Sequence, residues 1–578
     1  MERTENAAAI EVDRSELTTV GASNWDPRRA ILIGLLVLLA VLIIRGIGKG
    51  EFDYNVDESQ HAATGLFVSS FLHDHPLRHP VAYTYRYYAQ YPALSGVIHW
   101  PPLFYGVEGA MFFGFGASVV TARMTILLFA LIGWYFWFRW CSEIMGTWAA
   151  VLSTLWIALL PSTLLFEKAV MLEIPCLALC IIALYFWFRY LTDERQAHLY
   201  VFAGCAAGAL LTKQSSIFLP VVCLLTTGLL RKWRLVLNRR VLGPLALLVA
   251  LAGPYYALVY VVHWKTISMD LLGPGSLGAQ QSGAVQLGKA ILFYLQFLPQ
   301  QLGWPLLILA VAGILSYRLW SPWEPAAFML AWIAGGYITF AAIHHREGRY
   351  SFFWIPPFAY FATGLLTAKW RLRPLRALAG ALAVLLSVQV VATGWTYQRP
   401  YLKGYETLAA RIRSLSDSGV ILFDAPLPAN FIFFLRKLDQ QRKFVVLRKA
   451  LWTTRIKLSG GSEELAKTVS DVDNVIDQDG VKYVVVSDKP TIFEGQSSLL
   501  TVVHTDSRFE FLGTFPVESN EPEWNRRHLF LYRNNRPTLP AGRFLKVRMM
   551  TLSNDISVPW EELNQPHRDA PTGSTDSH

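Results

Sequence analysis

The feature that most constrains the fold is a series of long apolar runs between residues 30 and 395. A helix of about 20 apolar residues is long enough to cross the hydrocarbon core of a bilayer. Read in order, the runs predict about eleven spans: 30–48, 118–138, 146–165, 172–190, 198–212, 216–231, 241–262, 289–315, 325–343, 351–368 and 376–395. The chain is therefore predicted to be a mainly α-helical, polytopic membrane protein.

The composition agrees with a membrane protein. Hydrophobic residues make up 53% of the chain and charged residues only 16%, whereas about a quarter of a soluble domain is charged. The net charge of +10 does not require a nucleic acid partner, because Lys and Arg collect in the cytoplasmic loops of membrane proteins. All five cysteines lie in or beside apolar runs, so neither a disulfide framework nor a zinc site is predicted.

The distribution of basic residues predicts the orientation of the spans. With residues 1–29 as a cytoplasmic tail, the cytoplasmic turns contain "RYLTDERQ", "RKWRLVLNRR" and "KWRLRPLR", as the positive-inside rule requires. The opposite face then receives the 49–101 loop and everything after residue 396. The short apolar piece 102–116, which carries Glu108, is predicted to be a re-entrant or interfacial helix.

The character of the sequence changes after the membrane domain, 30–396. Short β-branched runs, "GVILFDA", "KFVVLR" and "VKYVVVSD", alternate with the helical patterns "NFIFFLRKL" and "SEELAKTVSDVDNVI". Such alternation predicts a small extracytoplasmic α/β domain over 397–552. Residues 553–578 are polar and are predicted to form a disordered tail.

Charged and polar residues gather where the predicted spans reach the non-cytoplasmic side. They come from four separate turns: Asp53, Asp57 and Glu58; Glu167, Lys168 and Glu173; Lys213; and His344, His345, Arg346, Glu347, Arg349 and Tyr350. We predict that they line one cavity in which carboxylates face cations. An acidic pair in a loop is more often a hydrated surface, and a lysine at a helix end more often extends into the headgroup layer. Glu173 differs, because a carboxylate at the start of an apolar span is costly and suggests a function by default.

This combination of side chains predicts a type of chemistry. A carboxylate can remove the proton of an attacking hydroxyl group as a general base, and cations can stabilise the charge of a departing phosphate. Arginine binds phosphate oxygens in a bidentate manner. Transfer of a sugar from a lipid-linked phosphate needs both parts. No Gly-rich phosphate-binding loop followed by a helix is present in the sequence, so nucleotide binding of that kind is not predicted.

Six ordered motifs over roughly residues 30–370 carry a resemblance to a known family. They are "VDESQHAATG", "HWPPLFYGVEG", "VVTARMTILLF", "VMLEIPCLAL", "GALLTKQSS" and "HHREGRYSFFWIPPFAYF". The chain resembles the GT-C superfamily of polyprenol-phosphate-sugar glycosyltransferases. Within that superfamily it is most similar to bacterial family 39 relatives of protein O-mannosyltransferases and to the aminoarabinose transferase that modifies lipid A.

The resemblance implies roles for individual residues. Asp57 matches the catalytic base, and its neighbour Glu58 would orient the acceptor or a metal ion. Glu173 occupies a position where many members have Asp. The residues expected at the donor phosphate are Lys213, Arg346, Arg349 and Tyr350. Further candidates for the same cavity are Arg123, His99, Trp100 and Glu167.

The resemblance also implies the reaction. A hexose or pentose would pass with inversion from a polyprenyl-phosphate donor to a lipid, glycan or protein acceptor, at the outer face of the bacterial cytoplasmic membrane. Some members use a divalent cation and others do not. Trp100 stands where many members have Lys before the two prolines, so a lysine contact with phosphate is not expected there. His99 would substitute in part.

Two other classes of protein fit part of the sequence. A secondary transporter would explain the many spans, but transporters place polar sites at mid-bilayer in broken helices related by repeats, and no repeat is visible here. A non-catalytic membrane scaffold with a partner-binding C-terminal domain would leave the ordered acidic and basic motifs unexplained.

Overall fold

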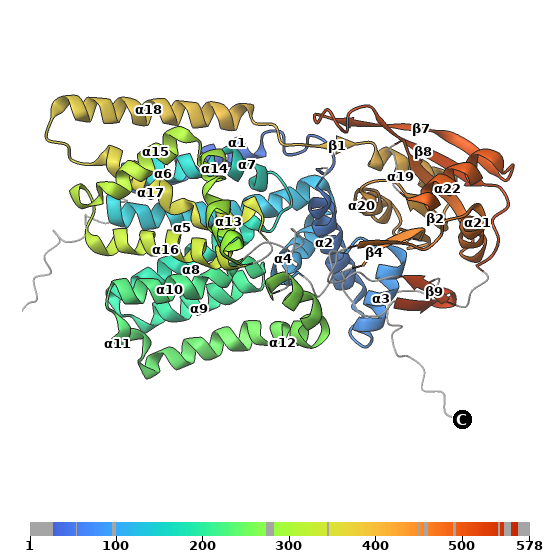
Figure 1. The fold of residues 1–578 in the computed structure, drawn as a ribbon, viewed down its shortest axis with the longest axis horizontal. Helices are drawn as coiled ribbons and strands as arrows, with labels where there is room; N and C mark the ends of the chain where they lie inside the picture. Colours follow the sequence, from blue (N-terminus) through green and yellow to red (C-terminus); the bar gives the residue numbers. More distant parts are fainter. Residues whose placement is uncertain are drawn as a thin grey trace, which may run out of the picture.

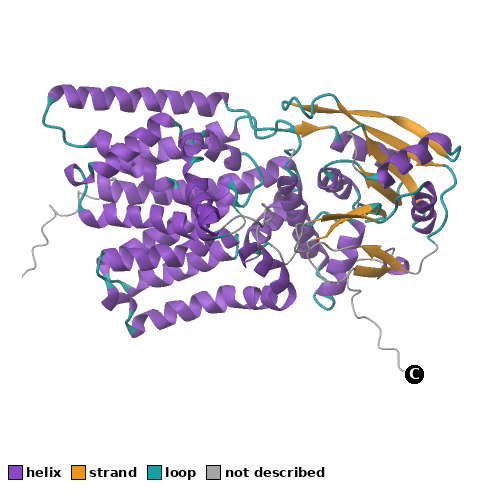
Figure 2. Cartoon of the chain, in the orientation of Figure 1, coloured by secondary structure: helices purple, strands orange, loops and turns teal. Residues whose placement is uncertain are grey.

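The computed structural model describes residues 27–53, 55–94, 100–272, 283–343, 346–448, 450–455, 461–488, 493–540, 544–547 and 556–563. The molecule is elongated and has two parts (Figure 1). A purely helical part holds α1 and α4 to α18, an α/β part follows it along the long axis, and α3 packs against the α/β part. Figure 2 shows all strands in the second part. The predicted fold class, a helical membrane domain with a small C-terminal α/β domain, is confirmed.

The described residues contain fewer uninterrupted spans than the sequence predicts. Six helical stretches are long and apolar enough to cross a membrane: α1 (Pro27–Ile44), α5 (Val119–Met145), α8 (Glu173–Asp193), Arg239–Val261 leading into α12 (Leu242–Leu272), α16 (Trp323–Ala342) and α18 (Arg373–Thr396). Two bent helix pairs raise the number to eight. One joins α6 (Thr147–Ala158) to α7 (Pro161–Glu167) at 71°, and the other joins Ile291–Leu302 to Trp304–Leu315 at 117°.

The predicted number of spans, about eleven, is read from apolar runs alone, which do not show whether a helix continues through the whole run. Three predicted spans become helices shorter than a bilayer crossing, α9 (Gln196–Leu210), α10 (Phe218–Leu229) and α17 (Pro356–Thr367). Proline explains several of the breaks, since it removes a backbone donor and fits best in the first turn of a helix. The other described helices that precede the α/β part in the sequence are α2 (Val56–Asp74), α3 (Pro80–Gln90), α4 (Leu103–Phe115), η2 (Gln214–Ile217), α11 (Trp233–Val236), η3 (Arg239–Val241), α13 (Gly283–Leu295), α14 (Leu298–Leu302), α15 (Trp304–Leu315), η4 (Tyr317–Leu319) and η5 (Gly348–Trp354).

Helix α2 lies between the two parts (Figure 1). Its first turn is capped by Asn55, whose side chain accepts a hydrogen bond from the backbone N–H of Asp57. Asp57 and Glu58 occupy that first turn, where the helix dipole favours negative charge. On the other side, Phe52 just before the helix packs edge-on against Phe433 of the α/β part, with ring centroids 4.9 Å apart. The segment is therefore held by both parts.

The α/β part is a six-stranded sheet in the order β1-β7-β8-β6-β2-β3. Strand β2 is parallel to β3 and β6, and the remaining pairs are antiparallel. The strands are β1 (Leu402–Lys403), β2 (Gly419–Asp424), β3 (Phe444–Leu447), β6 (Val481–Ser487), β7 (Phe509–Ser519) and β8 (Arg527–Asn534), with two separate hairpins, β4 (Trp452–Arg455) with β5 (Gly461–Glu464) and β9 (Phe544–Val547) with β10 (Ile556–Pro559).

Helices cover both faces of this sheet. The side chains of Ile421 and Phe423 face α19 (Tyr405–Leu415) and α20 (Pro428–Leu438). The alternate residues Val420 and Leu422 face α21 (Val469–Gln478) and α22 (Glu494–Thr505). This alternation follows from the two-residue period of a strand. The α19–α20 face shares one apolar core with α2 and the membrane helices.

Two details of the α/β part differ from the predicted pattern. The predicted helix "SEELAKTVSDVDNVI" starts late, because its first residues form β5 and the capping box of Thr468 and Asp471 sets the helix start at Val469. Residues assigned by composition to the polar tail from 553 onward include β10 and α23 (Trp560–Leu563). Ile556, Val558 and Leu563 are buried in the core on the α21–α22 side.

Candidate active site

Four chain segments bring charged residues together where the helical part meets α2. Asp57 comes from α2, Glu173 from the start of α8, Lys213 from the residue before η2, and Arg349 from η5. Arg349 Nη1 lies 2.8 Å from Asp57 Oδ2, and Lys213 Nζ lies 2.5 Å from Glu173 Oε1. Arg349 Nε is also 3.7 Å from Glu173 Oε1. These residues, with His61, are called the Asp57 cluster below.

Asp57 is the most accessible acid of the Asp57 cluster. Its side chain is 30% exposed, whereas that of Glu173 is fully buried. Burial acts to raise the pKa of Asp57, but the hydrogen bond and charge of Arg349 and the charge of Lys213 act to lower it, and the pKa lies below its usual value. Asp57 is therefore an ionised carboxylate at neutral pH, open enough to meet a substrate.

The sequence analysis missed one residue of this site, His61. His61 lies one helical turn after Asp57 and is buried, with Nδ1 2.7 Å from the hydroxyl oxygen of Tyr105. Burial lowers the pKa of His61 to about 4, so the imidazole is neutral at pH 7. The signal was the i, i+4 spacing, which puts two residues on one helix face.

Trp100 lies beside the same group. Its ring centroid is 5.8 Å from that of His61 and 5.5 Å from Lys213 Nζ. A cation over an aromatic face is stabilised by the ring quadrupole. The residue before the two prolines thus packs its aromatic ring against Lys213.

Glu58, the neighbour of Asp57, belongs to a different group. Its Oε1 accepts a hydrogen bond from Arg123 Nε at 3.1 Å, and both of its oxygens accept from Arg399 Nη1 at 2.9 and 2.8 Å. Backbone N–H groups of Asp53 and Val170 complete the set at 2.6 and 3.1 Å. The Glu58 side chain is 1% exposed. We call Glu58 and these four partners the Glu58 clasp. The resemblance assigns the Glu58 carboxylate to the acceptor or a metal ion, but in this structure its oxygens accept hydrogen bonds from the protein itself.

The other predicted site residues have the following surroundings. Arg346 donates hydrogen bonds to the carbonyl oxygen of Ala341, and the ring of Tyr350 stacks on Phe340. Glu167 is buried and accepts a 2.6 Å hydrogen bond from Trp134 Nε1. His99, His344 and His345 lie outside the described residues. Within the part of the chain that the structure describes, no group of three or more His, Cys, Asp or Glu side chains is placed to hold a metal ion.

The Glu58 clasp predicts an acid-sensitive step in stability. Burial acts to raise the pKa of Glu58, but Arg399 and Arg123 outweigh it and hold the pKa at about 2. The folded pKa lies below the unfolded value, so the stabilisation is complete above about pH 4.5 and is lost as the pH falls towards 2. By linkage, a shift of this size amounts to on the order of 3 kcal/mol. Thermal unfolding in detergent is expected to show a larger loss of Tm between about pH 6 and pH 3 for the wild type than for Glu58→Gln. Equal losses would contradict the prediction.

The chain is similar to known proteins in part of its sequence and in its fold. Residues 101–258 match the family model described as dolichyl-phosphate-mannose-protein mannosyltransferase. No curated protein sequence matches the chain. The structure is similar to ArnT from Cupriavidus metallidurans bound to undecaprenyl phosphate, with 15% identity, 88% of this chain and 98% of that chain covered, and a TM-score of 0.54. For the apo form of the same ArnT the identity is 13%, the coverage is again 88% and 98%, and the TM-score is 0.56.

These findings confirm the resemblance predicted from the sequence. The chain has the fold of the GT-C glycosyltransferases, and its family match covers the segment from the two prolines at 101 and 102 into α12. The Archaeoglobus fulgidus oligosaccharyltransferase is also similar, at 12% identity with 78% of this chain and 68% of that chain covered and a TM-score of 0.48.

Proposed function

We propose that this protein transfers a sugar from a polyprenyl-phosphate donor to a hydroxyl group of an acceptor, with inversion at the anomeric carbon. The observation that carries the proposal is the Asp57 cluster. An ionised, partly exposed carboxylate stands 2.8 Å from an arginine, beside a lysine that is 2.5 Å from a buried glutamate. The fold supports a lipid-linked donor, since the similar ArnT structure is bound to undecaprenyl phosphate.

The proposed reaction assigns one task to each side of the Asp57 cluster. Asp57 accepts the proton of the acceptor hydroxyl group, and the acceptor oxygen forms a bond to C1 of the sugar. The bond from C1 to the phosphate oxygen breaks, and its electron pair leaves with the polyprenyl phosphate. Lys213 and Arg349 stabilise the negative charge of that phosphate. When the donor binds, before the transfer, Arg349 exchanges part of its contact with Asp57 for the phosphate, which frees Asp57 to act as the base.

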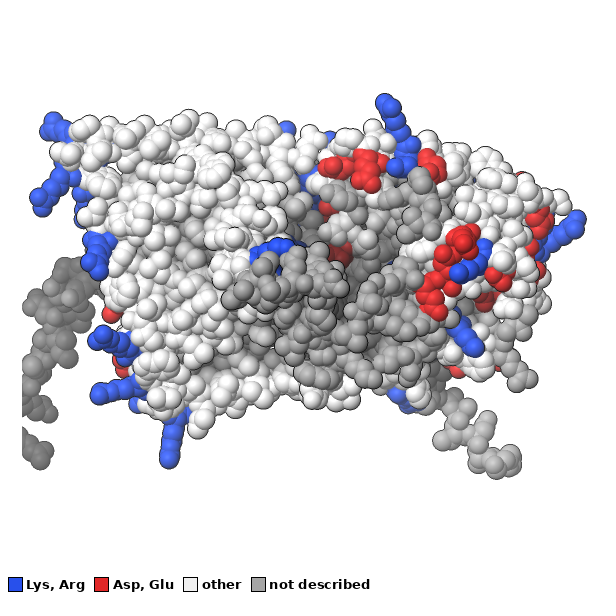
Figure 3. All heavy atoms as spheres, viewed as in Figure 1, with Lys and Arg blue, Asp and Glu red and all other residues white. Residues whose placement is uncertain are grey.

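The distribution of charge supports an active site on the outer face of a bacterial cytoplasmic membrane. On the face seen in Figure 3, Lys and Arg side chains gather at the end of the helical part away from the α/β part. At the C-terminal ends of α5 and α8, Arg189 lies 3.2 Å from Glu143, and Arg139 lies 3.3 Å from the same residue. Basic residues favour the cytoplasmic side, so the Asp57 cluster and the α/β part take the opposite side in this proposal.

The acceptor in this proposal is a lipid, a glycan or a protein hydroxyl group, and the donor sugar is a hexose or a pentose. A turnover assay tests the class of reaction. The protein is purified in detergent and incubated with a panel of polyprenyl-phosphate sugars and host membrane extract. Release of polyprenyl phosphate together with labelled product is expected. If every donor remains intact while reconstituted vesicles accumulate a solute, the proposal fails and the protein is a transporter.

A further inference from the structure

The loop before α2 is joined to the α/β part through its backbone. The Glu51 N–H donates to the carbonyl oxygen of Leu402 at 2.7 Å, and the Leu402 N–H donates to Phe52 at 2.9 Å. Leu402 begins β1, the edge strand of the six-stranded sheet. Exposed strand edges offer unpaired backbone groups for such pairing. The loop that leads to Asp57 thus extends the sheet of the C-terminal domain.

The side chain of Glu51 strengthens the same junction. Its carboxylate accepts hydrogen bonds from the backbone N–H groups of Gly404 at 2.9 Å, Tyr405 at 3.1 Å and Glu406 at 3.0 Å. These groups form the N-terminus of α19, where the first N–H groups have no partner within the helix and the dipole favours an acid. The buried carboxylate of Glu51 therefore completes a helix of the other domain.

Arg399 joins this junction to the turn that carries Asp57. It follows the last membrane helix and is 4% exposed. Its Nη2 donates to the carbonyl oxygen of Glu51 at 3.0 Å, while its Nη1 donates to both oxygens of Glu58. One guanidinium group thus holds both ends of the 51–58 segment. Arg123 supports it from α5, since it donates to Glu58 and to the Glu51 carbonyl oxygen.

We propose that Arg399 is a positioning residue for Asp57, and that through it the C-terminal domain forms part of the active site. Asp57 and Glu58 are consecutive residues of the same helical turn. That turn cannot move towards or away from Arg349 without breaking the buried charge-assisted hydrogen bonds that Glu58 accepts from Arg399 and Arg123. This inference rests on the proposed function. The C-terminal domain then sets the distance from the base to the cations.

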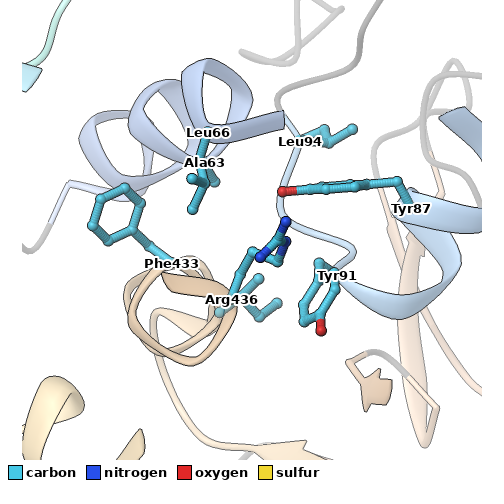
Figure 4. Close-up of a pocket in the computed structure, with 8 residues that line it drawn as sticks. Ala63, Leu66, Tyr87, Tyr91, Leu94, Phe433 and Arg436 are labelled. Atoms are coloured by element: carbon cyan, nitrogen blue, oxygen red, sulfur yellow. The ribbon is translucent and has the colours of Figure 1, made fainter. Parts of the chain in front are cut away.

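A second set of buried contacts joins the domains at the far end of α2 and serves as a control. Arg442 of the α/β part pairs with Asp74 and donates to the hydroxyl oxygen of Tyr83 at 2.9 Å. Close by, Arg436 lies between the rings of Tyr87 and Tyr91, at 5.6 Å from each centroid, beside a small hollow (Figure 4). Asp74 lies 17 residues after Asp57 in α2, which corresponds to about 26 Å along the helix.

The test compares Arg399→Gln with Arg442→Gln in the full-length protein, because each removes one buried cation between the same two domains. We expect Arg399→Gln to lower kcat about 100-fold at a temperature well below its Tm, since a misplacement of about 1 Å has an effect of that size. The KM for the donor should change less than about 3-fold. Arg399→Lys should recover part of the rate. Arg442→Gln should lower Tm by about as much as Arg399→Gln does. It should keep kcat within about 3-fold of the wild-type value.

Hydrogen exchange gives a readout that does not depend on turnover. The amides of residues 52–60 should exchange faster in Arg399→Gln than in the wild type, and should be unchanged in Arg442→Gln. If Arg399→Gln fails to fold, Glu51→Gln replaces it in both measurements with a smaller expected loss. A wild-type kcat in Arg399→Gln, or equal losses in both variants, would overturn the inference. Loss of protection without any donor turnover by the wild type would instead reject the proposed function alone.

Discussion

Asp57→Asn is expected to reduce sugar transfer by about 10³-fold while the protein stays folded. General base catalysis contributes about 10² to 10⁴ to a rate, and no other acid of the Asp57 cluster is both ionised and open, since Glu173 is fully buried. Asn has nearly the same shape and its amide oxygen can still accept the hydrogen bond from Arg349. The variant therefore removes the basic carboxylate and keeps the contacts around it unchanged. The measurement is single-turnover release of polyprenyl phosphate, with Tm recorded beside it.

Glu347→Gln is the matched control for this variant. Glu347 also pairs with Arg349, so the substitution removes one acidic partner of the arginine and keeps the proposed base. We expect transfer within about 5-fold of the wild type. If Asp57→Asn keeps full activity, or if both variants lose the same amount, the role of Asp57 is to hold Arg349 and another group takes the proton.

Lys213→Gln is expected to impair both stability and turnover. Lys213 and Glu173 form a buried ion pair, and removing one partner of such a pair typically costs about 3–5 kcal/mol because the remaining charge is left without compensation. The donor phosphate would also lose a cation. Tm and donor KM are measured together, and both a lower Tm and a KM raised about 10-fold or more are expected.

The double variant Glu173→Gln with Lys213→Gln separates the two effects. It removes both charges and leaves two amides that can hydrogen-bond, so Tm should recover most of the loss. Turnover should stay low, because no lysine faces the phosphate. Recovery of wild-type turnover together with Tm would show that Lys213 only balances the charge of Glu173, and would remove it from the proposed donor site.

The sequence predicted all members of the Asp57 cluster except His61, because those four residues stand at the ends of apolar runs. Asp57, Glu173, Lys213 and Arg349 were all candidates, and the structure brings them within hydrogen-bond or ion-pair distance. A charged side chain at the end of an apolar span indicates a functional or paired group, since burying a charge without a partner is costly. Charged side chains that stand at the same end of several packed membrane helices are expected to lie close together.

Neighbouring residues in the sequence were harder to separate. Asp57 and Glu58 form one acidic pair in the sequence, but successive residues of a helix point about 100° apart. Glu58 therefore faces Arg123 and Arg399 while Asp57 faces Arg349. His61, four residues after Asp57, returns to the first face. Recognising that the motif begins a helix would have predicted that the two acids face different neighbours.

Local properties of the chain determined the membrane helices, the strand and helix alternation of the C-terminal domain and the acids and bases at span ends, because length, period and charge are written in consecutive residues. Only the tertiary structure decided which apolar runs stay unbroken, which carboxylate remains open, and that Arg399 and Glu51 join the C-terminal domain to the Asp57 turn. Arg399 meets Glu58 across 341 residues of sequence. Such a contact depends on how the helical part and the α/β part pack together, and no local pattern encodes it.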